Sequence, residues 1–171
     1  MDTLLGIISI QTFWKILLFV HFVLAVSLLA MVTLQTVAVL MPAGLMPARQ
    51  AAGNVISRMP PVPAASYATL IVIVYVLQAL MGAWIYVKYR TYVRIPMEGF
   101  RHWWTVGSFE IKEHVVTMGL ALLPAYWYFW QQPLSDEHAT VRKWITVFLA
   151  FTVWYSFLVG HVANDFRGVG S

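Results

Sequence analysis

SFEIKEHVVTMGLALLPAYWYFW, residues 108–130, is an apolar stretch whose first turns carry four ionisable side chains: Glu110, Lys112, Glu113 and His114. A plain membrane anchor does not need such a cluster. Ionisable groups at the edge of the hydrocarbon cost free energy, so they usually mark a function. The sequence therefore predicts a membrane-spanning helix with a functional N-terminal end.

The composition is that of an integral membrane protein. Of the 171 residues, 60% are hydrophobic and only 11% are charged, and the mean hydropathy is +0.72. The formal charge of +4 comes from loop cations that set orientation in the membrane, and nothing indicates nucleic-acid binding. Because the chain has no cysteine, disulfides, thiolate metal sites and iron–sulfur clusters are excluded. Any bound metal or haem must use histidine, methionine or carboxylate ligands.

Four stretches are long enough to cross a hydrocarbon core of about 30 Å, which needs about 20 apolar residues. They are residues 13–41, 67–89, 108–131 and 141–164. With connections of modest length, they predict an all-α fold: one membrane domain over residues 1–171, built as an up-down-up-down four-helix bundle. Residues 3–10 are apolar but too short to span, so we expect an interfacial lead-in.

The connecting segments have distinct compositions. Residues 42–66 are rich in Pro, Gly and Ala and predict a loop with one short surface helix. Residues 91–107 mix arginine with Phe and Trp, which predicts a segment lying flat at the interface. Ser108 is the expected N-cap of the third span. In the second span, Gln78 and Gly82 predict a close helix contact with one polar link.

The distribution of Lys and Arg predicts the orientation. Seven lie on the side that holds both termini, against four on the other: Lys15, Lys88, Arg90, Arg94, Arg101, Lys112 and Arg167, against Arg49, Arg58, Arg142 and Lys143. The positive-inside rule then places both termini in the cytoplasm.

Three histidines are predicted to lie near that same side. His21 is near the start of the first span, His114 near the start of the third, and His161 near the end of the fourth. Each of the last two has a carboxylate four residues away, Glu110 before His114 and Asp165 after His161. Residues four apart share a helix face.

The first interpretation is a b-type haem. Two histidines on different helices at matched depth can bind haem b axially, and cations near the surface can bind its propionates. We predict His21 and His114 as axial ligands, with His161 as the substitute for either. The cations at the right level are Lys15, Arg101, Lys112 and Arg167. The function would be electron transfer, with quinone or within a larger redox complex.

Two other interpretations stay open. Glu110, His114, His161 and Asp165 offer ligands of the types that suit Fe, Cu or Zn in a metal-binding or metal-transport protein. Alternatively, these side chains cap helices and pair with one another in a structural accessory subunit without a cofactor. Nucleophilic catalysis has little support, because no cysteine is available and Ser108 is expected to be a cap.

The first span, WKILLFVHFVLAVSLLAMV at residues 14–32, resembles the first helix of small bacterial four-helix membrane proteins. These are the copper-resistance-D-like group and related b-type cytochromes, which also open with an aromatic residue or Lys, a few apolar residues and a His. The resemblance implies a small bundle that binds haem or copper through an intramembrane histidine. Two-haem cytochromes of this kind have histidines near both membrane sides, whereas the candidates here lie near one, which favours a single haem.

Overall fold

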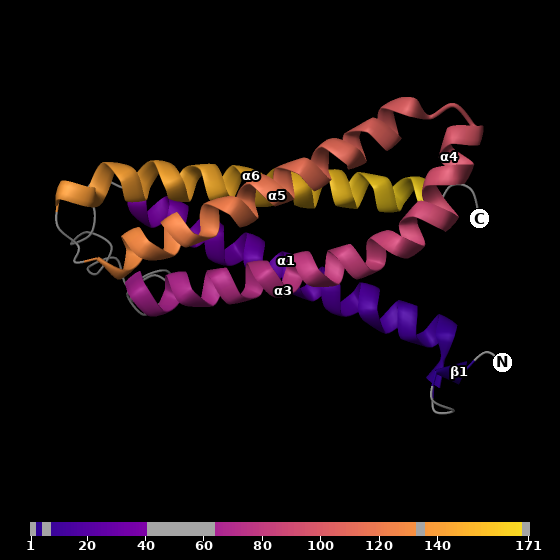
Figure 1. Ribbon diagram of the computed structural model, residues 1–171, viewed down its shortest axis with the longest axis horizontal. Coiled ribbons are helices and arrows are strands. Elements are labelled where there is room, and N and C mark those ends of the chain that lie inside the picture. The colour runs from indigo at the N-terminus through magenta and orange to yellow at the C-terminus, as the bar shows by residue number, and fades with distance from the viewer. Residues whose placement is uncertain (1–2, 5–7, 41–63, 133–135, 169–171) are drawn as a thin grey trace, which may run out of the picture.

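A computed structural model describes residues 3–4, 8–40, 64–132 and 136–168 (Figure 1). The described residues form four long helices: α1 (Ile10–Leu40), α3 (Ala64–Tyr89), α5 (Trp103–Gln131) and α6 (Ala139–Gly168). The shorter elements are β1 (Thr3–Leu4), β2 (Ile8–Ser9), the π-helix η2 (Arg90–Arg94), α4 (Ile95–Gly99) and the 3₁₀-helix η3 (Asp136–His138). The predicted all-α fold class is confirmed.

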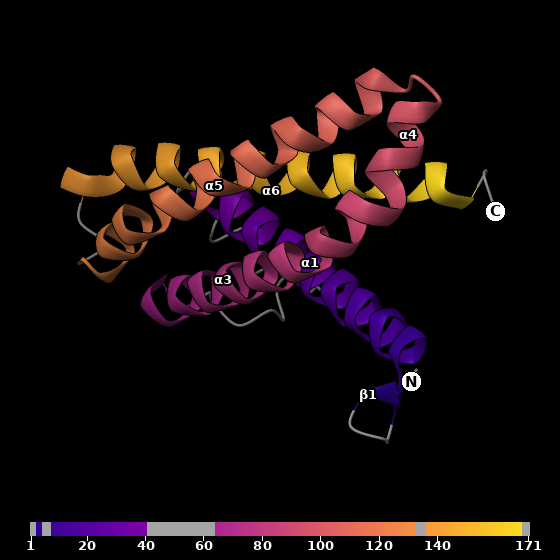
Figure 2. The same cartoon turned by 45° about the vertical axis from the view of Figure 1, so that its right-hand side comes forward.

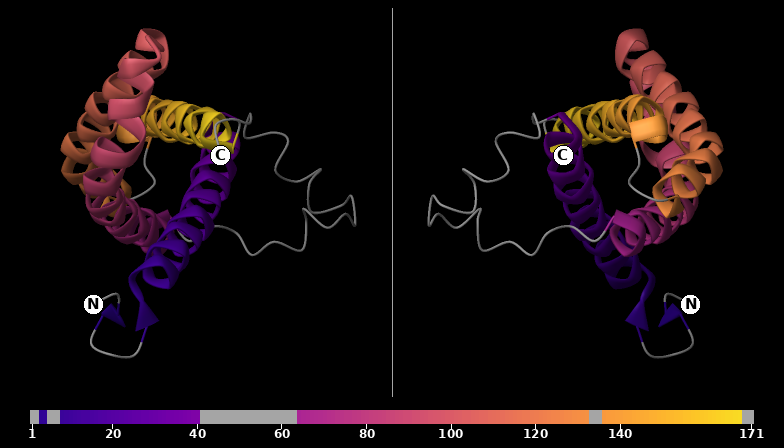
Figure 3. Two further views of the ribbon diagram at one scale, coloured as in Figure 1. Left: turned by 90° about the vertical axis from the view of Figure 1, so that its right-hand side faces the viewer. Right: turned by 90° about the vertical axis from the view of Figure 1, so that its left-hand side faces the viewer.

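The long helices alternate in direction along the chain, so that the N- and C-termini lie toward the same end (Figure 1). Contacts join α1 to α3, α3 to α5, α5 to α6, and α6 back to α1. The end-on views of Figure 3 show the four helices around the long axis, and Figure 2 shows that α1 is inclined to α6. Helix α3 therefore lies between α1 and α5 and contacts both.

Three helical segments are long and apolar enough to cross a membrane: Ile10–Leu40, Ala65–Gly99 and Ala139–His161. Large apolar side chains along them point outward, among them Phe19, Leu80 and Phe151, as lipid-facing positions require. Helix α5 is long enough but is not among the three. Its membrane crossing stays a prediction.

Two helix boundaries predicted between α3 and α5 were wrong. The helix does not end at residue 89 but continues through η2 and α4, and the interfacial position of residues 91–107 stays a prediction. Pro96 has no N–H for an α-helical bond, and the wider π turns lie immediately before it. Helix α5 then begins at Trp103, five residues before the expected cap at Ser108, because nothing in residues 103–107 breaks a helix.

Two further predictions lie near the N-terminus and in the long loop. Residues 3–10 do not form a simple lead-in: Thr3 pairs with Ser9 and Leu4 with Ile8 in a small antiparallel ladder. Such a ladder satisfies backbone groups that a short extended segment would leave unpaired. The short helix expected within residues 42–66 lies outside the described residues.

The buried core lies mainly in the half away from the termini. It joins Val32 of α1, Ile71 of α3, Tyr126 of α5 and Leu149 of α6, all almost fully buried. A smaller cluster at the other end includes Tyr89 and Val106 and ties α5 to the end of α3. The end that holds the termini is thus less completely filled by apolar side chains.

A buried hydrogen bond links two helices within the main core. The Tyr126 hydroxyl donates to Gln35 Oε1, with exposed fractions of 0% and 1%. Gln35 Nε2 has no partner among the described residues. We expect Tyr126→Phe to lower the free energy of unfolding by about 1–3 kcal/mol, because it leaves the whole Gln35 amide buried and unbonded. The measurement is thermal unfolding in mild detergent.

The matched control is the double variant Gln35→Leu/Tyr126→Phe, which removes both polar groups. Replacing both partners by apolar groups of similar shape is nearly neutral, so the double variant should be more stable than Tyr126→Phe alone. A double variant less stable than either single variant would contradict this account.

Candidate functional site

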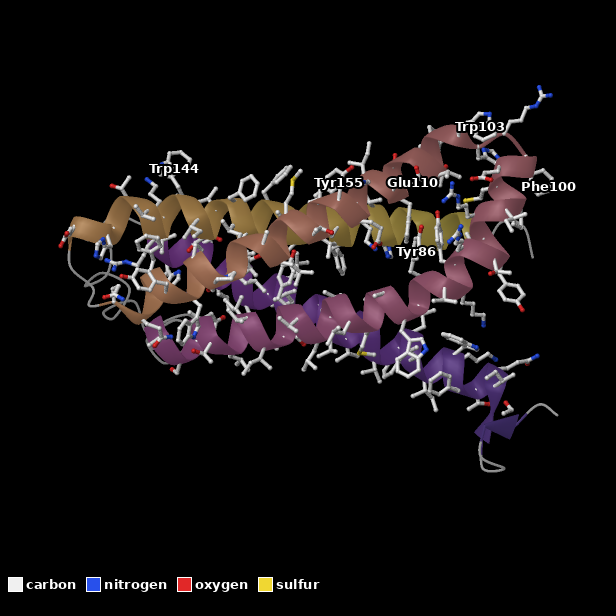
Figure 4. The ribbon with its side chains drawn as sticks, viewed as in Figure 1. Tyr86, Phe100, Trp103, Glu110, Trp144 and Tyr155 are labelled. Carbon is white, nitrogen blue, oxygen red and sulfur yellow. The ribbon has the colours of Figure 1, made fainter. Side chains whose placement is uncertain are left out.

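The ionisable first turns of α5 lie against the end of α3, where Phe109 stacks on Tyr89, and Lys112 lies within electrostatic range of His21 on α1. Figure 4 labels Glu110 on α5 and Tyr86 on α3, which lie near the same end of the molecule. Three groups of side chains occupy this region: an arginine–glutamate network, an aromatic stack covered by a lysine, and a histidine–glutamine pair.

The arginine–glutamate network is centred on Arg94 in η2. Its Nη1 lies 3.0 Å from Glu110 Oε1 on α5, and its Nε lies 2.7 Å from Glu98 Oε1 on α4. Tyr86 is a further hydrogen-bond partner of Arg94. Glu110 is thus bound to a cation and ties η2 to α5.

The aromatic stack lies beside this network. The rings of Tyr89 and Phe109 are almost parallel, with centroids 3.8 Å apart. Lys112 Nζ lies 4.4 Å from the Phe109 centroid and 2.9 Å from Glu113 Oε1, and the Lys112 side chain is only 15% exposed. The ammonium is therefore turned inward, where a charge needs such partners.

The histidine–glutamine pair links α1 to α3. His21 Nε2 lies 3.2 Å from Gln78 Nε2, and a Cβ on Gly82 would lie 3.3 Å from His21 Cε1. The predicted close contact with one polar link at Gln78 and Gly82 is confirmed, and its partner is His21. Lys112 lies within electrostatic range of this imidazole.

Two polar atoms of this pair are buried without a partner among the described residues, His21 Nδ1 and Gln78 Oε1. With its amide nitrogen toward the ring, Gln78 donates to His21 Nε2 and the ring carries its proton on Nδ1. Buried polar groups are nearly always hydrogen-bonded, so two unpartnered atoms on one pair call for an explanation. In this tautomer the pair can bind a polar group, and Nδ1 can bind a metal only when the amide is turned so that the proton lies on Nε2.

The other predicted haem ligands point elsewhere. His114 is exposed, and its Nδ1 lies 2.7 Å from the carbonyl oxygen of Glu110 in its own helix. His114 follows Lys112 by two residues, so the two side chains point about 200° apart around the helix axis. Because Lys112 points to the interior, His114 points away from it. His161 is exposed and its ring is stacked on Phe157. The structure brings His21 together with Gln78, but not with His114 or His161.

The predicted propionate cations lie toward the same end. Lys15 is exposed on the first turns of α1, and Arg101 is exposed in the turn between α4 and α5. Lys112 is already paired with Glu113. Arg167 lies in the last turn of α6, and its side chain is outside the described residues.

The predicted metal shell is not assembled in the part of the chain that the structure describes. No group of three or more His, Cys, Asp or Glu side chains is positioned to hold a metal ion there. Glu110 is bound to Arg94, and the Asp165 side chain lies outside the described residues. A site that includes Asp165 stays a prediction.

Sequence reasoning missed two residues of this region. The sequence predicts Gln78 only as the polar link of a helix contact, with no role in a site, and Arg94 only as an interfacial cation. The signal for Gln78 was available, because an amide inside an apolar span is costly and needs a partner. The pairing of Arg94 with Glu110 was not available, since it depends on η2 and α4 continuing α3.

No protein-family model matches the sequence, and no significant match is found among curated proteins or solved structures. The resemblance of residues 14–32 to copper-resistance-D-like proteins therefore stays a prediction.

Proposed function

We propose that the protein is a membrane electron-transfer protein of the b-type cytochrome kind, with one haem b bound at His21. The observation that carries this proposal is the buried, unpartnered Nδ1 of His21 beside the unpartnered Oε1 of Gln78. A bound haem would supply one-electron exchange between its ferric and ferrous forms. The chain would supply a ligand, its orientation and an apolar surrounding.

The residues around His21 fit this role in three respects. Gly82 leaves space at the face of the imidazole, because any larger side chain there would crowd Cε1. Gln78 holds one ring nitrogen, as the second partner of a metal-ligating histidine usually does. If the Gln78 amide turns its oxygen toward the ring, the oxygen accepts a hydrogen bond from Nε2–H of His21, and the unprotonated Nδ1 is left as a ligand. Lys112 supplies a nearby positive charge for a carboxylate.

The second axial position has two candidates in the chain. His114 on α5 and His161 on α6 lie toward the same end as His21, and both are exposed in this conformation. Either would have to turn inward to bind the same haem as His21. We keep both as proposed ligands and place His21 first, because its imidazole already lies between two helices.

The proposed setting is a bacterial inner membrane. The helices would form an up-down-up-down bundle with both termini in the cytoplasm, supported by the Lys and Arg distribution and by the contacts around the four helices. The lipid bilayer would surround the exposed apolar side chains. The electron partner would be a quinone or another subunit of a redox complex.

The test is the cofactor content of protein purified in mild detergent from haem-replete cells. We expect one haem b per chain by pyridine haemochrome assay, with less than stoichiometric non-haem Fe, Cu and Zn by elemental analysis. A stoichiometric non-haem metal without haem would replace this function with the metal-binding one. Protein with neither would instead be a structural subunit.

Glu110→Gln separates the haem from the metal interpretation. We expect unchanged haem content, because Glu110 is bound to Arg94 and is not near His21 in any described contact. The ion pair is partly exposed, so the free energy of unfolding should fall by only about 0.2–1 kcal/mol. The measurements are metal and haem content with thermal unfolding. Loss of a bound metal ion from Glu110→Gln, with Glu98→Gln unchanged, would contradict the proposal.

A further inference from the structure

Residues 90–104, here called the interfacial segment, expose an unusual amount of apolar surface next to cations. It comprises η2, α4, the following turn and the first residues of α5. Its largest exposed apolar side chains are Tyr92, Ile95, Phe100, Trp103 and Trp104, with Phe100 75% exposed. Figure 4 labels Phe100 and Trp103 at the outer edge of the molecule, pointing away from the other helices.

The cations of this segment fall into two groups. Arg94 is bound to Glu98 and Glu110. Arg90 and Arg101 are exposed, and no carboxylate within the described ranges forms an ion pair with either. Glu98 and Glu110, the carboxylates nearest in sequence to Arg101, are thus already paired with Arg94. The segment presents two exposed positive charges beside exposed aromatic rings.

Arg101 stands where the backbone favours glycine. Its φ is 60°, and among the described residues it is the one non-glycine residue with positive φ. The turn is held by Arg101 N–H donating to Glu98 O and His102 N–H donating to Met97 O, as in a helix C-terminal motif that usually contains glycine. Arginine in this backbone conformation costs free energy that glycine would not, which indicates that the Arg101 side chain has a function.

We propose that the interfacial segment binds anionic phospholipid head groups at the membrane surface. Arg90 and Arg101 would contact the phosphates, while Phe100, Trp103 and Trp104 would lie among the head groups. Residues 90–99 of the segment are the last ten residues of the apolar helical stretch Ala65–Gly99. Aromatic belts and basic residues meet anionic lipid at the ends of such membrane helices. This inference does not depend on the haem proposal.

The test is the stabilisation of the full-length protein in neutral detergent by added lipid. We expect phosphatidylglycerol to raise the unfolding temperature more than phosphatidylcholine does. In the variant Arg90→Gln/Arg101→Gly, the phosphatidylglycerol concentration that gives half of the rise should increase by about fivefold for each arginine removed. Arg101→Lys should keep the lipid effect, because it keeps the charge.

Arg101→Gly alone separates binding from folding. Without lipid it should unfold at the same temperature as the wild type or higher, because glycine relieves the turn, yet it should respond less to phosphatidylglycerol. Lys143→Gln, which removes a partly exposed cation at the start of α6, is the matched control and should respond like the wild type. Equal effects of the two lipids, an unchanged response of the double variant, or the same loss in Lys143→Gln would overturn the proposal.

Discussion

Gly119→Val is expected to be the most destabilising single substitution in the four long helices. A Cβ at this position would lie 1.9 Å from Tyr75 Oη, 2.7 Å from Tyr75 Cζ and 3.0 Å from Thr152 Oγ1. The tyrosine lies across α5 at this point, and its hydroxyl donates to Val116 O at 3.2 Å. Helices α3, α5 and α6 therefore meet at a place that only glycine fits.

The expected loss combines two effects. Overpacking a filled core costs about 1–3 kcal/mol, and displacing the Tyr75 ring breaks a hydrogen bond worth about 1 kcal/mol. Because the ring is stiff, it must move as a whole. The measurement is thermal unfolding of Gly119→Ala and Gly119→Val in detergent, with valine expected to unfold at the lower temperature.

Gly107→Ala is the matched control, because it lies on the same helix and a Cβ there meets nothing within 4 Å. It should be neutral or slightly stabilising. In a Tyr75→Ala background, Gly119→Ala should cost much less, since the obstructing ring is gone. A Gly119→Ala protein as stable as Gly107→Ala would show that the three helices do not pack this closely.

His21→Ala is expected to abolish haem binding while the helices stay folded. The imidazole is the one predicted ligand that lies between α1 and α3, in contact with Gln78. Gln78→Leu should weaken haem affinity by about 10–100-fold, as the loss of a ligand's hydrogen-bonding partner commonly does. The measurement is haem titration of purified apoprotein, with circular dichroism as the check on folding.

The other histidines provide the controls for this prediction. His138→Ala should bind haem like the wild type, because His138 lies in η3, near the opposite end, against Phe129. His114→Ala and His161→Ala decide which residue is the second ligand: the variant with an altered spectrum identifies it. A folded His21→Ala protein with wild-type haem affinity would remove His21 from the site.

The helices themselves were predictable, since apolar stretches of spanning length are a strong signal. The contact of Gln78 and Gly82 with another helix was predictable as well, although its partner was not. The start of α5 was not predictable, because residues 103–107 carry no helix signal of their own. The helix begins there because the chain turns at Arg101, just before Trp103.

The direction in which each histidine side chain points could not be predicted. A helix that is apolar on all sides has no periodicity that shows which face points to the interior. The depth of each histidine in the membrane could therefore be predicted, but not the side of the helix on which it points. His114 and Lys112 were expected on one side of a shared site, but Lys112 takes the interior and His114 the outside. The long-range pairing of Glu110 with Arg94 likewise depends on packing between distant segments.

The absorption spectrum of the purified wild-type protein, oxidised and then reduced with dithionite, tests the central claim most directly. We predict a sharp α band and a Soret band that shifts on reduction, both lost in His21→Ala. Folded wild-type protein from haem-replete cells that shows neither band would contradict the claim that this membrane protein binds haem at His21.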